Sequence, residues 1–504
     1  MKKYKLFAAS IFSAAFMLTG CSDSFLEVES PTQVTIEDYF TTNEHVYEAL
    51  IATYDPLQWF DWSMNQYNPV NIMSDIMADD IWVGGSGKTD NQYWHLMMNY
   101  EALPNNCMTG LWTVSYSGVK RANDVIKYIG WAKDDITSEN QKIYEAEARV
   151  LRNYYYTLLW KFWGNIPYYT ENLEFPYIKE QSAADDVYNN IVTDLEQVIA
   201  MKVLPMKASS ANQGRVTQAM AYMLYAEIVM YQNDETRYAT ALNYMKEIIA
   251  DGSYDLVSDY ASIWEESGEW SKESIWEINY KDDNAARSWG NPQYAGGTVL
   301  PRLISPNGWA DGTAGRDNGW GFCPVRKETY ERYAEGDSRR DATCFNAAAA
   351  GSYNARYQDT GFFLDKYIAR NGYNADQIAD ADLNFNNNLR VYRFSETLLN
   401  AAELIARGAG TGDASAYLNK VHKRAGLTNT VEPTIDNILE ERHLEFVGEG
   451  KRYWDLVRSG KAASVLVPDI YGYRTNTWSA KKTHLPIPQG EIDAAQGTLV
   501  QNNY

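Results

Sequence analysis

The sequence predicts a mainly α-helical protein, in which a helical-repeat scaffold is interrupted by one loop-rich insertion. Two observations support this fold class. Apolar residues recur at spacings of three and four over long stretches, whereas residues 252–394 are rich in Gly, Asn, Asp, Trp and Tyr and show few such stripes. Pairs of helices joined by short loops are typical of helical-repeat proteins, although no clean repeat of fixed length recurs. We therefore expect residues 41–251 and 395–504 to form the scaffold and residues 252–394 to form the insertion.

Individual helices follow from the same periodicity. Ser182 and Asp185 have the spacing of a capping box, and one helical face follows with Val187, Ile191, Leu195, Val198 and Ile199. Similar patterns predict helices over residues 45–54, 111–129, 139–162, 218–230 and 238–250. After the insertion, we expect helices over residues 395–405, 414–424, 435–446 and 451–458.

The amino-terminal segment has the pattern of a bacterial lipoprotein signal. Lys2, Lys3 and Lys5 precede an apolar run over residues 6–17, which is too short to span a bilayer as a finished helix. Leu18-Thr19-Gly20 then precedes Cys21, as in a lipobox. These features predict a signal peptide over residues 1–20, lipidation at Cys21 and a tether over residues 21–40.

Charge and motif spacing exclude several classes of function. With 66 acidic and 45 basic residues, the formal charge of −21 repels nucleic acids and anionic lipid headgroups, so neutral ligands fit better. The Gly-rich segment at residues 84–89 is not a phosphate loop, because Trp82 stands where the first Gly is required. The five His residues have no ligand spacing. We expect no cofactor and no metal from these motifs.

The cysteines allow at most one disulfide. If Cys21 carries lipid, then Cys107, Cys323 and Cys344 remain, and Cys323 and Cys344 are the nearer pair along the chain. Their spacing does not establish a bridge, so both free thiols and one disulfide remain open.

A short acidic segment has the alternating oxygens of a calcium loop, at Asp380, Asp382 and Asn384. Phe385 replaces the turn Gly and Val391 replaces the bidentate Glu, which excludes an EF-hand. A looser calcium site and a solvated polar loop remain as the alternatives.

The aromatic content is the strongest functional signal. The chain has 16 Trp and 38 Tyr, and several rings have polar neighbours: Trp59, Trp62, Trp82, Tyr93, Trp94, Trp289, Tyr294, Trp309 and Trp320. A flat ring suits the apolar face of a pyranose, and covering ~40 Å² of that face gives about 1 kcal/mol. From this set, the candidate glycan-binding residues are Trp82, Trp289, Tyr294, Trp309 and Trp320. The alternative for each ring is a place in the core.

Motifs along the whole chain resemble the SusD/RagB family, the outer-membrane surface lipoproteins of Bacteroidetes that capture glycans. They are the lipobox with Ser24-Phe25-Leu26-Glu27, Arg121-Ala122-Asn123, Ala148-Arg149-x-Leu151-Arg152, Trp163-Gly164-Asn165-Ile166-Pro167, Gly214-Arg215-Val216-Thr217, Tyr392-Arg393-Phe394-Ser395-Glu396, Glu441-Arg442-His443-Leu444-Glu445-Phe446, Leu485-Pro486-Ile487-Pro488 and Gln501-Asn502-x-Tyr504. We interpret the block at residues 440–461 as structural, with Glu441, Arg442 and Glu445 pairing charges at helical spacings of three and four.

The resemblance implies both a fold and a partner. The fold is a tetratricopeptide-like scaffold, with loops and short strands building the glycan face. The partner is a SusC-like TonB-dependent outer-membrane transporter, over which the lipoprotein closes to deliver oligosaccharide.

We therefore expect a non-catalytic cell-surface glycan-binding protein, anchored by lipid in the outer membrane. The alternatives are a helical glycoside hydrolase and a helical-repeat protein-binding module. The doublets Asp79-Asp80 and Glu265-Glu266 give the hydrolase little support, because adjacent side chains point apart.

Overall fold

The computed structural model describes residues 34–310 and 315–504, and both the predicted signal peptide and Cys21 lie outside the described residues. After the short helix α2 (Ile36–Tyr39), long helices dominate the first half: α3 (Asn43–Trp59), α6 (Thr109–Trp131), α7 (Ser138–Trp163), α8 (Ala184–Met201), α9 (Gln218–Gln232) and α10 (Tyr238–Asp251). Helices resume near the carboxyl terminus with α15 (Phe394–Ala406), α16 (Ala414–Arg424), α17 (Ile435–Phe446), α18 (Arg452–Arg458), α19 (Ala462–Val465) and α20 (Gln489–Ala494). The predicted mainly α-helical class is confirmed.

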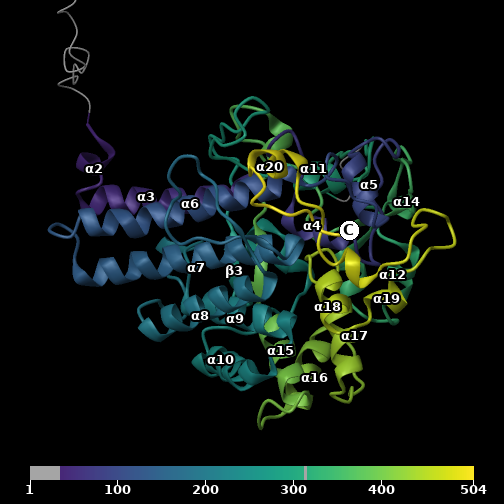
Figure 1. Cartoon of the computed structure of the whole chain (residues 1–504). Helices are drawn as coiled ribbons and strands as arrows, with labels where there is room; N and C mark the ends of the chain where they lie inside the picture. Colours follow the sequence, from purple (N-terminus) through teal and green to yellow (C-terminus); the bar gives the residue numbers. More distant parts are fainter. Residues whose placement is uncertain (1–33, 311–314) are drawn as a thin grey trace, which may run out of the picture.

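Successive helices pack on one another in chain order. α6 packs on both α3 and α7, and α8, α9 and α10 continue the stack downwards in Figure 1. α10 then packs on α15, which also contacts α16 and α17, so the carboxyl-terminal helices extend the same array. This arrangement is a tetratricopeptide-like helical-repeat scaffold.

The helix ends follow from local capping. Thr42, Thr137, Thr217 and Thr434 each accept a backbone N–H in the first turn of α3, α7, α9 and α17.

The predicted capping box of α8 is wrong. α8 begins after Ala183, which provides no side-chain cap, and Ser182 lies instead in strand β2 (Gln181–Ser182), which pairs with β1 (Ile166–Pro167). The Asn165 side chain accepts the N–H of Ala184 at 2.9 Å and so caps the helix from a distant loop. The predicted apolar face of α8 is buried, as expected.

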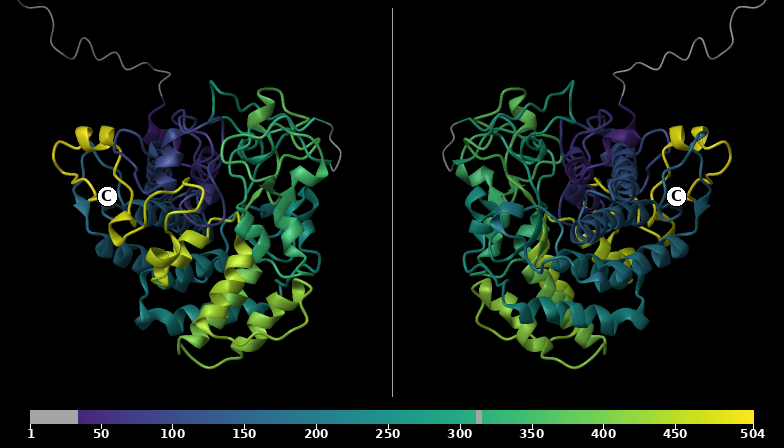
Figure 2. Two further views of the ribbon diagram at one scale, coloured as in Figure 1. Left: turned by 90° about the vertical axis from the view of Figure 1, so that its right-hand side faces the viewer. Right: turned by 90° about the vertical axis from the view of Figure 1, so that its left-hand side faces the viewer.

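The segment between α10 and α15 contains only short elements within its described residues. Its α-helices and strands are β3 (Ser274–Ile278), α11 (Leu300–Ile304), α12 (Lys327–Arg332), α13 (Arg339–Thr343), β4 (Cys344–Asn346), α14 (Ala347–Ala350), β5 (Phe362–Leu364) and β6 (Leu389–Arg393), with antiparallel pairs β3–β6 and β4–β5. The described residues of the segment also form 3-10 helices over residues 261–264, 266–268 and 381–383. The β3–β6 pair brings the two ends of the segment together, and Figure 2 shows it gathered, in teal and green, on one side of the scaffold. Its assignment as a separate unit of residues 252–394 stays a prediction.

The early loop between α3 and α6 contains two further helices, α4 (Val70–Asp75) and α5 (Gln92–Met98). It runs against the loop-rich segment through bridges between Ile81 and Val325 and between Gly84 and Phe322. Gly84 has φ of +74°, and a Cβ there would lie 2.5 Å from the Gly321 carbonyl oxygen. The Gly-rich stretch therefore permits close backbone approach.

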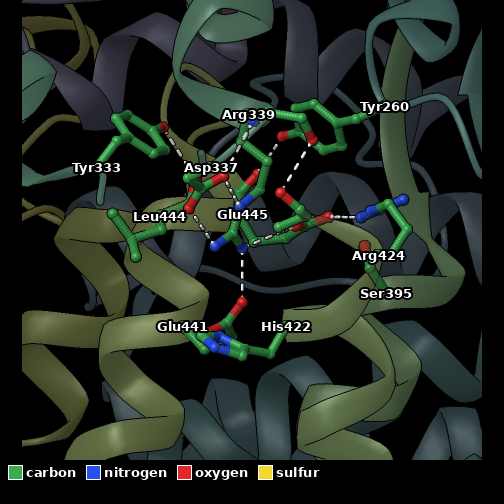
Figure 3. A network of polar contacts seen from close by, with 12 residues as sticks. Tyr260, Tyr333, Asp337, Arg339, Ser395, His422, Arg424, Glu441, Leu444 and Glu445 are labelled. Atoms are coloured by element: carbon green, nitrogen blue, oxygen red, sulfur yellow. Dashed lines mark hydrogen bonds and ion pairs between the residues drawn. The ribbon is translucent and has the colours of Figure 1, made fainter. Parts of the chain in front are cut away.

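A buried ion network fixes α17 to both halves of the molecule (Figure 3). Glu445 accepts from Arg424 at 2.5 Å, Arg393 at 3.0 Å and Arg339 at 3.3 Å, while Glu441 accepts from Arg339 at 2.6 Å. Burial alone would raise the pKa of Glu445, but these arginines outweigh it and hold the pKa well below its usual range.

The block at residues 440–461, which carries part of the resemblance, is therefore structural. The expected pairing within α17 is wrong, because Glu441 and Glu445 are bound by arginines from other segments. Arg442 likewise pairs outside α17, with Asp455 at 2.8 Å.

Within the described residues, no helix is both long enough and apolar enough to cross a membrane.

Candidate functional site

Four aromatic rings from three separate segments form a cluster that reaches the surface. Trp62 and Tyr67 follow α3, Trp289 lies in the loop after β3, and Trp320 lies beyond α11; we call these four residues the aromatic platform. Trp62 lies 5.0 Å from Trp289 in an edge-to-face contact, and Trp289 lies 6.2 Å from Trp320 at an interplanar angle of 27°. Tyr67 lies 4.6 Å from Trp62 and 5.8 Å from Trp320.

The platform is partly open to solvent. Trp289 is 36% exposed, while Trp62, Tyr67 and Trp320 are half-buried. Rings in this state have packed edges that fix their positions and accessible atoms that can contact a ligand. This combination suits the apolar face of a sugar.

Backbone hydrogen bonds hold the platform loops in place. The carbonyl oxygen of Tyr67 accepts from the Tyr93 hydroxyl at 2.5 Å and from the Trp94 indole at 3.0 Å. The N–H of Trp289 donates to Asp380 at 3.0 Å. The buried Tyr93 and Trp94 rings therefore support the site from beneath.

The acidic segment that resembles a calcium loop contacts the loop that carries Trp289. Asp380 accepts from Trp289, Asp382 pairs with Arg302 at 2.7 Å, and the Asn384 amide donates to the Arg287 carbonyl at 2.8 Å. These contacts show that the polar segment also anchors the loop that carries Trp289.

Charged side chains lie beside the platform. Burial, followed by the negative charges of Asp90 and Asp382, raises the pKa of Tyr67 to about 12. Arg356 lies 3.7 Å from Asp90. Alternating donors and acceptors of this kind can bind the hydroxyl rim of a sugar whose face rests on the rings.

Two predicted site residues are buried instead. Trp82 is 1% exposed, with the Arg326 guanidinium 4.0 Å from its ring and Tyr473 against its edge. Trp309 is 4% exposed and packs with Phe345 in a small core cluster. The reason for Trp82 is local, because it lies in the apolar run Ile81-Trp82-Val83. Neither ring presents a face to a ligand in this structure, which corrects the expectation for both.

The other three predicted site residues are at least partly exposed. Trp289 and Trp320 belong to the platform, and Tyr294 lies on the Trp289 loop with 55% of its surface exposed. Sequence reasoning included Trp62 among its aromatic candidates but did not select it, and it missed Tyr67. The signal for Tyr67 was present in its polar neighbours Asn65, Gln66 and Asn68.

One further cluster of possible metal ligands is already engaged in hydrogen bonds within the protein. Asp79, Asp80 and His443 lie close enough to share an ion, but Arg452 already binds Asp79 through two nitrogens at 2.8 and 3.0 Å, and His443 contacts Asp80 at 2.6 Å. The three described cysteines, Cys107, Cys323 and Cys344, are free buried thiols, so the open disulfide question is answered in favour of thiols.

Comparisons with known proteins found both matching family models and similar solved structures. One family model, described as the SusD family, matches residues 335–504, and a second, described as starch-binding associating with outer membrane, matches residues 24–230. The chain is 65% identical to surface glycan-binding protein A from Bacteroides thetaiotaomicron, solved in complex with laminarihexaose; the match covers 92% of this chain and 100% of that chain with a TM-score of 0.90.

Two further solved structures are similar over the same extent. Surface glycan-binding protein A from Bacteroides uniformis is 51% identical, with 92% and 100% coverage and a TM-score of 0.84. A protein described as a laminarin binding SusD-like protein is 29% identical, with 92% and 99% coverage and a TM-score of 0.81. Such identity over nearly complete chains, together with matching models at both ends, means that this protein belongs to the SusD family.

Proposed function

We propose that this protein is a non-catalytic cell-surface binder of neutral glucans of the laminarin type, which it captures on the aromatic platform. The observation that carries the proposal is the convergence of Trp62, Tyr67, Trp289 and Trp320 at one partly exposed site with charged groups beside it. The relatives described as binding laminarihexaose and laminarin support the choice of ligand. A neutral glucan also avoids repulsion from the chain's charge of −21.

The platform supplies affinity in modest increments. Each ring that covers ~40 Å² of a sugar face contributes about 1 kcal/mol, so two or three rings give useful binding that still allows release. Tyr294, exposed on the same loop as Trp289, extends the proposed contact surface.

Calorimetric titration with laminarin and laminarihexaose tests the proposal. Trp289→Ala is expected to weaken binding by about 1 to 3 kcal/mol, or roughly five- to a hundredfold. The matched control is Trp131→Ala, which removes a half-buried ring at the far end of α6. If the wild type does not bind these glucans, the proposed function is wrong. If Trp289→Ala and Trp131→Ala bind them equally well, the platform is not the site.

The absence of catalysis is part of the same proposal. Asp90 and Asp382, whose charges contribute to the raised pKa of Tyr67, each lie beside an arginine, which suits them to accept hydrogen bonds from sugar hydroxyls. Product analysis after prolonged incubation with laminarin is expected to show no new reducing ends. If reducing ends accumulate with the wild type and disappear with Asp382→Asn, the protein is a hydrolase.

Anchoring and delivery complete the proposed role. We propose that Cys21 is lipidated and holds the protein at the outer membrane, where it passes glycan to a SusC-like TonB-dependent transporter. Cys21→Ala is expected to release the protein from the membrane fraction. Detergent extraction of the lipidated protein should recover a TonB-dependent transporter with it; recovery of the binder alone would restrict its role to capture.

A further inference from the structure

A second aromatic hollow, lined by none of the platform residues, lies between the start of α6 and the carboxyl-terminal helix α20. Its volume is about 380 Å³, and it is lined by side chains from α6, from the segment after β1 and from α20 and the residues beyond it. We call it the α6–α20 groove and define it by Trp112, Tyr116, Tyr169, Tyr177, Glu491 and Thr498. Figure 1 shows α20, in yellow, above the end of α6 that enters the loop-rich side.

The floor of the groove is a fixed stack of rings. Tyr116 and Tyr169 are stacked at 6.0 Å with an interplanar angle of 12°, and Trp112 lies 5.1 Å from Tyr116. The Tyr116 hydroxyl donates to the Pro167 carbonyl at 2.9 Å, which holds its ring in place. Tyr177 forms part of the wall and is 69% exposed. The rings are thus positioned before any ligand arrives, which lowers the entropic cost of binding.

The groove also contains a hydrogen-bond acceptor without a cation partner. In the described part of the chain, Glu491 forms no ion pair, and burial raises its pKa against a single opposing hydrogen bond from Trp112. Thr113, Thr498 and Lys179 add hydroxyl and ammonium groups to the lining. Trp112 is buried beneath the others, so the half-buried Tyr116 and Tyr169 and the exposed Tyr177 are the rings that, beside these polar groups, can match the two surfaces of a sugar.

The groove and the platform are adjacent. Gln66, next to Tyr67 of the platform, accepts the N–H of Thr109 at 2.9 Å and of Gly110 at 3.0 Å, so the platform loop caps the first turn of α6. Tyr116 lies about 10 Å further along that helix at 1.5 Å per residue. About two turns of one helix therefore connect the platform loop to the groove, and a glycan chain of several sugar units is the ligand that would contact both.

We propose that the α6–α20 groove is a second carbohydrate site, which binds a distal stretch of the same neutral glucan chain held by the platform. This inference rests on the proposed function. Binding at the platform makes the second contact intramolecular, so a long chain gains affinity that a short oligosaccharide does not. The groove thus favours polysaccharide over small sugars.

The test compares a short and a long ligand with two matched aromatic variants. Tyr177→Ala removes a ring from the groove, whereas Phe175→Ala removes an 85% exposed ring from the same segment, outside the groove lining. Calorimetric titration with laminarin is expected to show at least about tenfold weaker binding for Tyr177→Ala than for Phe175→Ala. Titration with laminaritriose, which occupies the platform alone, is expected to give equal affinities.

A second variant tests the groove without changing the loop that carries Tyr177. Ala494→Trp adds bulk to an exposed groove residue on α20 and is expected to reduce laminarin affinity as Tyr177→Ala does. Equal laminarin affinity for Tyr177→Ala, Ala494→Trp and Phe175→Ala overturns the second site. Failure of the wild type to bind either ligand would instead overturn the proposed function, so the two failures are distinguishable.

Discussion

Arg287 donates to Asp61 through two nitrogens, at 2.6 Å and 3.1 Å, and both side chains are buried. Asp61 immediately precedes Trp62, and Arg287 lies two residues before Trp289, so this ion pair joins the two segments that carry neighbouring platform rings. Asp61 also accepts from the Val299 N–H at 2.6 Å, and Arg287 donates to the Trp62 carbonyl at 3.2 Å. Formation of the platform is therefore tied to folding of the loop-rich segment.

Removing the arginine should damage both stability and binding. Arg287→Met leaves the Asp61 carboxylate buried without a cation, and we expect the free energy of unfolding to fall by about 3 to 5 kcal/mol. Glucan affinity, measured at a temperature where the variant is folded, should also fall because Trp62 and Trp289 lose their common support. Urea unfolding and calorimetry measure the two effects.

An exposed ion pair provides the control for that variant. Arg332 and Glu440 lie 3.0 Å apart with side chains 37% and 47% exposed, so Arg332→Met should cost less than about 1 kcal/mol. If Arg287→Met unfolds as easily as Arg332→Met, the buried pair does not secure the platform.

Substitution of the buried tryptophans should lower stability and leave the contacts with ligand unchanged. Truncating Trp82 or Trp309 to Ala removes a packed ring, and we expect each change to cost about 3 to 5 kcal/mol of unfolding free energy. At low temperature the folded fraction should bind glucan with wild-type affinity. A large loss of affinity without a change in the melting temperature would show that these rings contact the ligand.

The helices were predictable because their signal is local. The bounds of α16 and α17 match the prediction, since helical periodicity fixes which residues face the core. The site was only partly predictable. Composition selected Trp289 and Trp320, which lie in the candidate site, but it could not show that Arg326 covers Trp82.

Partners that lie far apart in the chain escaped the same reasoning. Glu441 and Glu445 had charges within reach on their own helix, yet Arg339 and Arg424 bind them from other segments. Tyr67 becomes part of a site only because three segments converge around it. The spacing of residues along the sequence does not indicate that these three segments meet.

The free thiols give a simple chemical prediction. Burial raises the pKa of Cys107 to about 12 and raises those of Cys323 and Cys344 further, so these groups stay protonated and unreactive in the folded protein. In a protein lacking Cys21, a thiol reagent should label no cysteine under native conditions and three in denaturant. Fewer than three in denaturant without reductant would reveal a disulfide.

Acid should destabilise the protein through carboxylates that are paired inside the fold, and Glu227, whose side chain is 20% exposed, is the clearest case. It lies 2.5 Å from Lys161 and also accepts from the Tyr392 hydroxyl. Burial alone would raise the pKa of Glu227, but Lys161 and Lys451 outweigh it and lower the pKa to about 2. Because the folded-state pKa lies below the unfolded value of about 4.3, the stabilisation is present above that pH and is lost as the pH falls toward 2.

The expected size of this effect is on the order of 3 kcal/mol. Glu227→Gln should lower the unfolding free energy at pH 7, since Lys161 stays buried without its partner charge, and it should flatten the decline between pH 5 and pH 3. Urea unfolding at successive pH values measures the difference between variant and wild type, which isolates Glu227 from the other carboxylates. Asp436→Asn is the control, because its pair with Lys461 is exposed, with 78% and 40% of the side chains accessible. If the curves of wild type and Glu227→Gln run parallel as the pH falls, Glu227 does not contribute to the acid sensitivity.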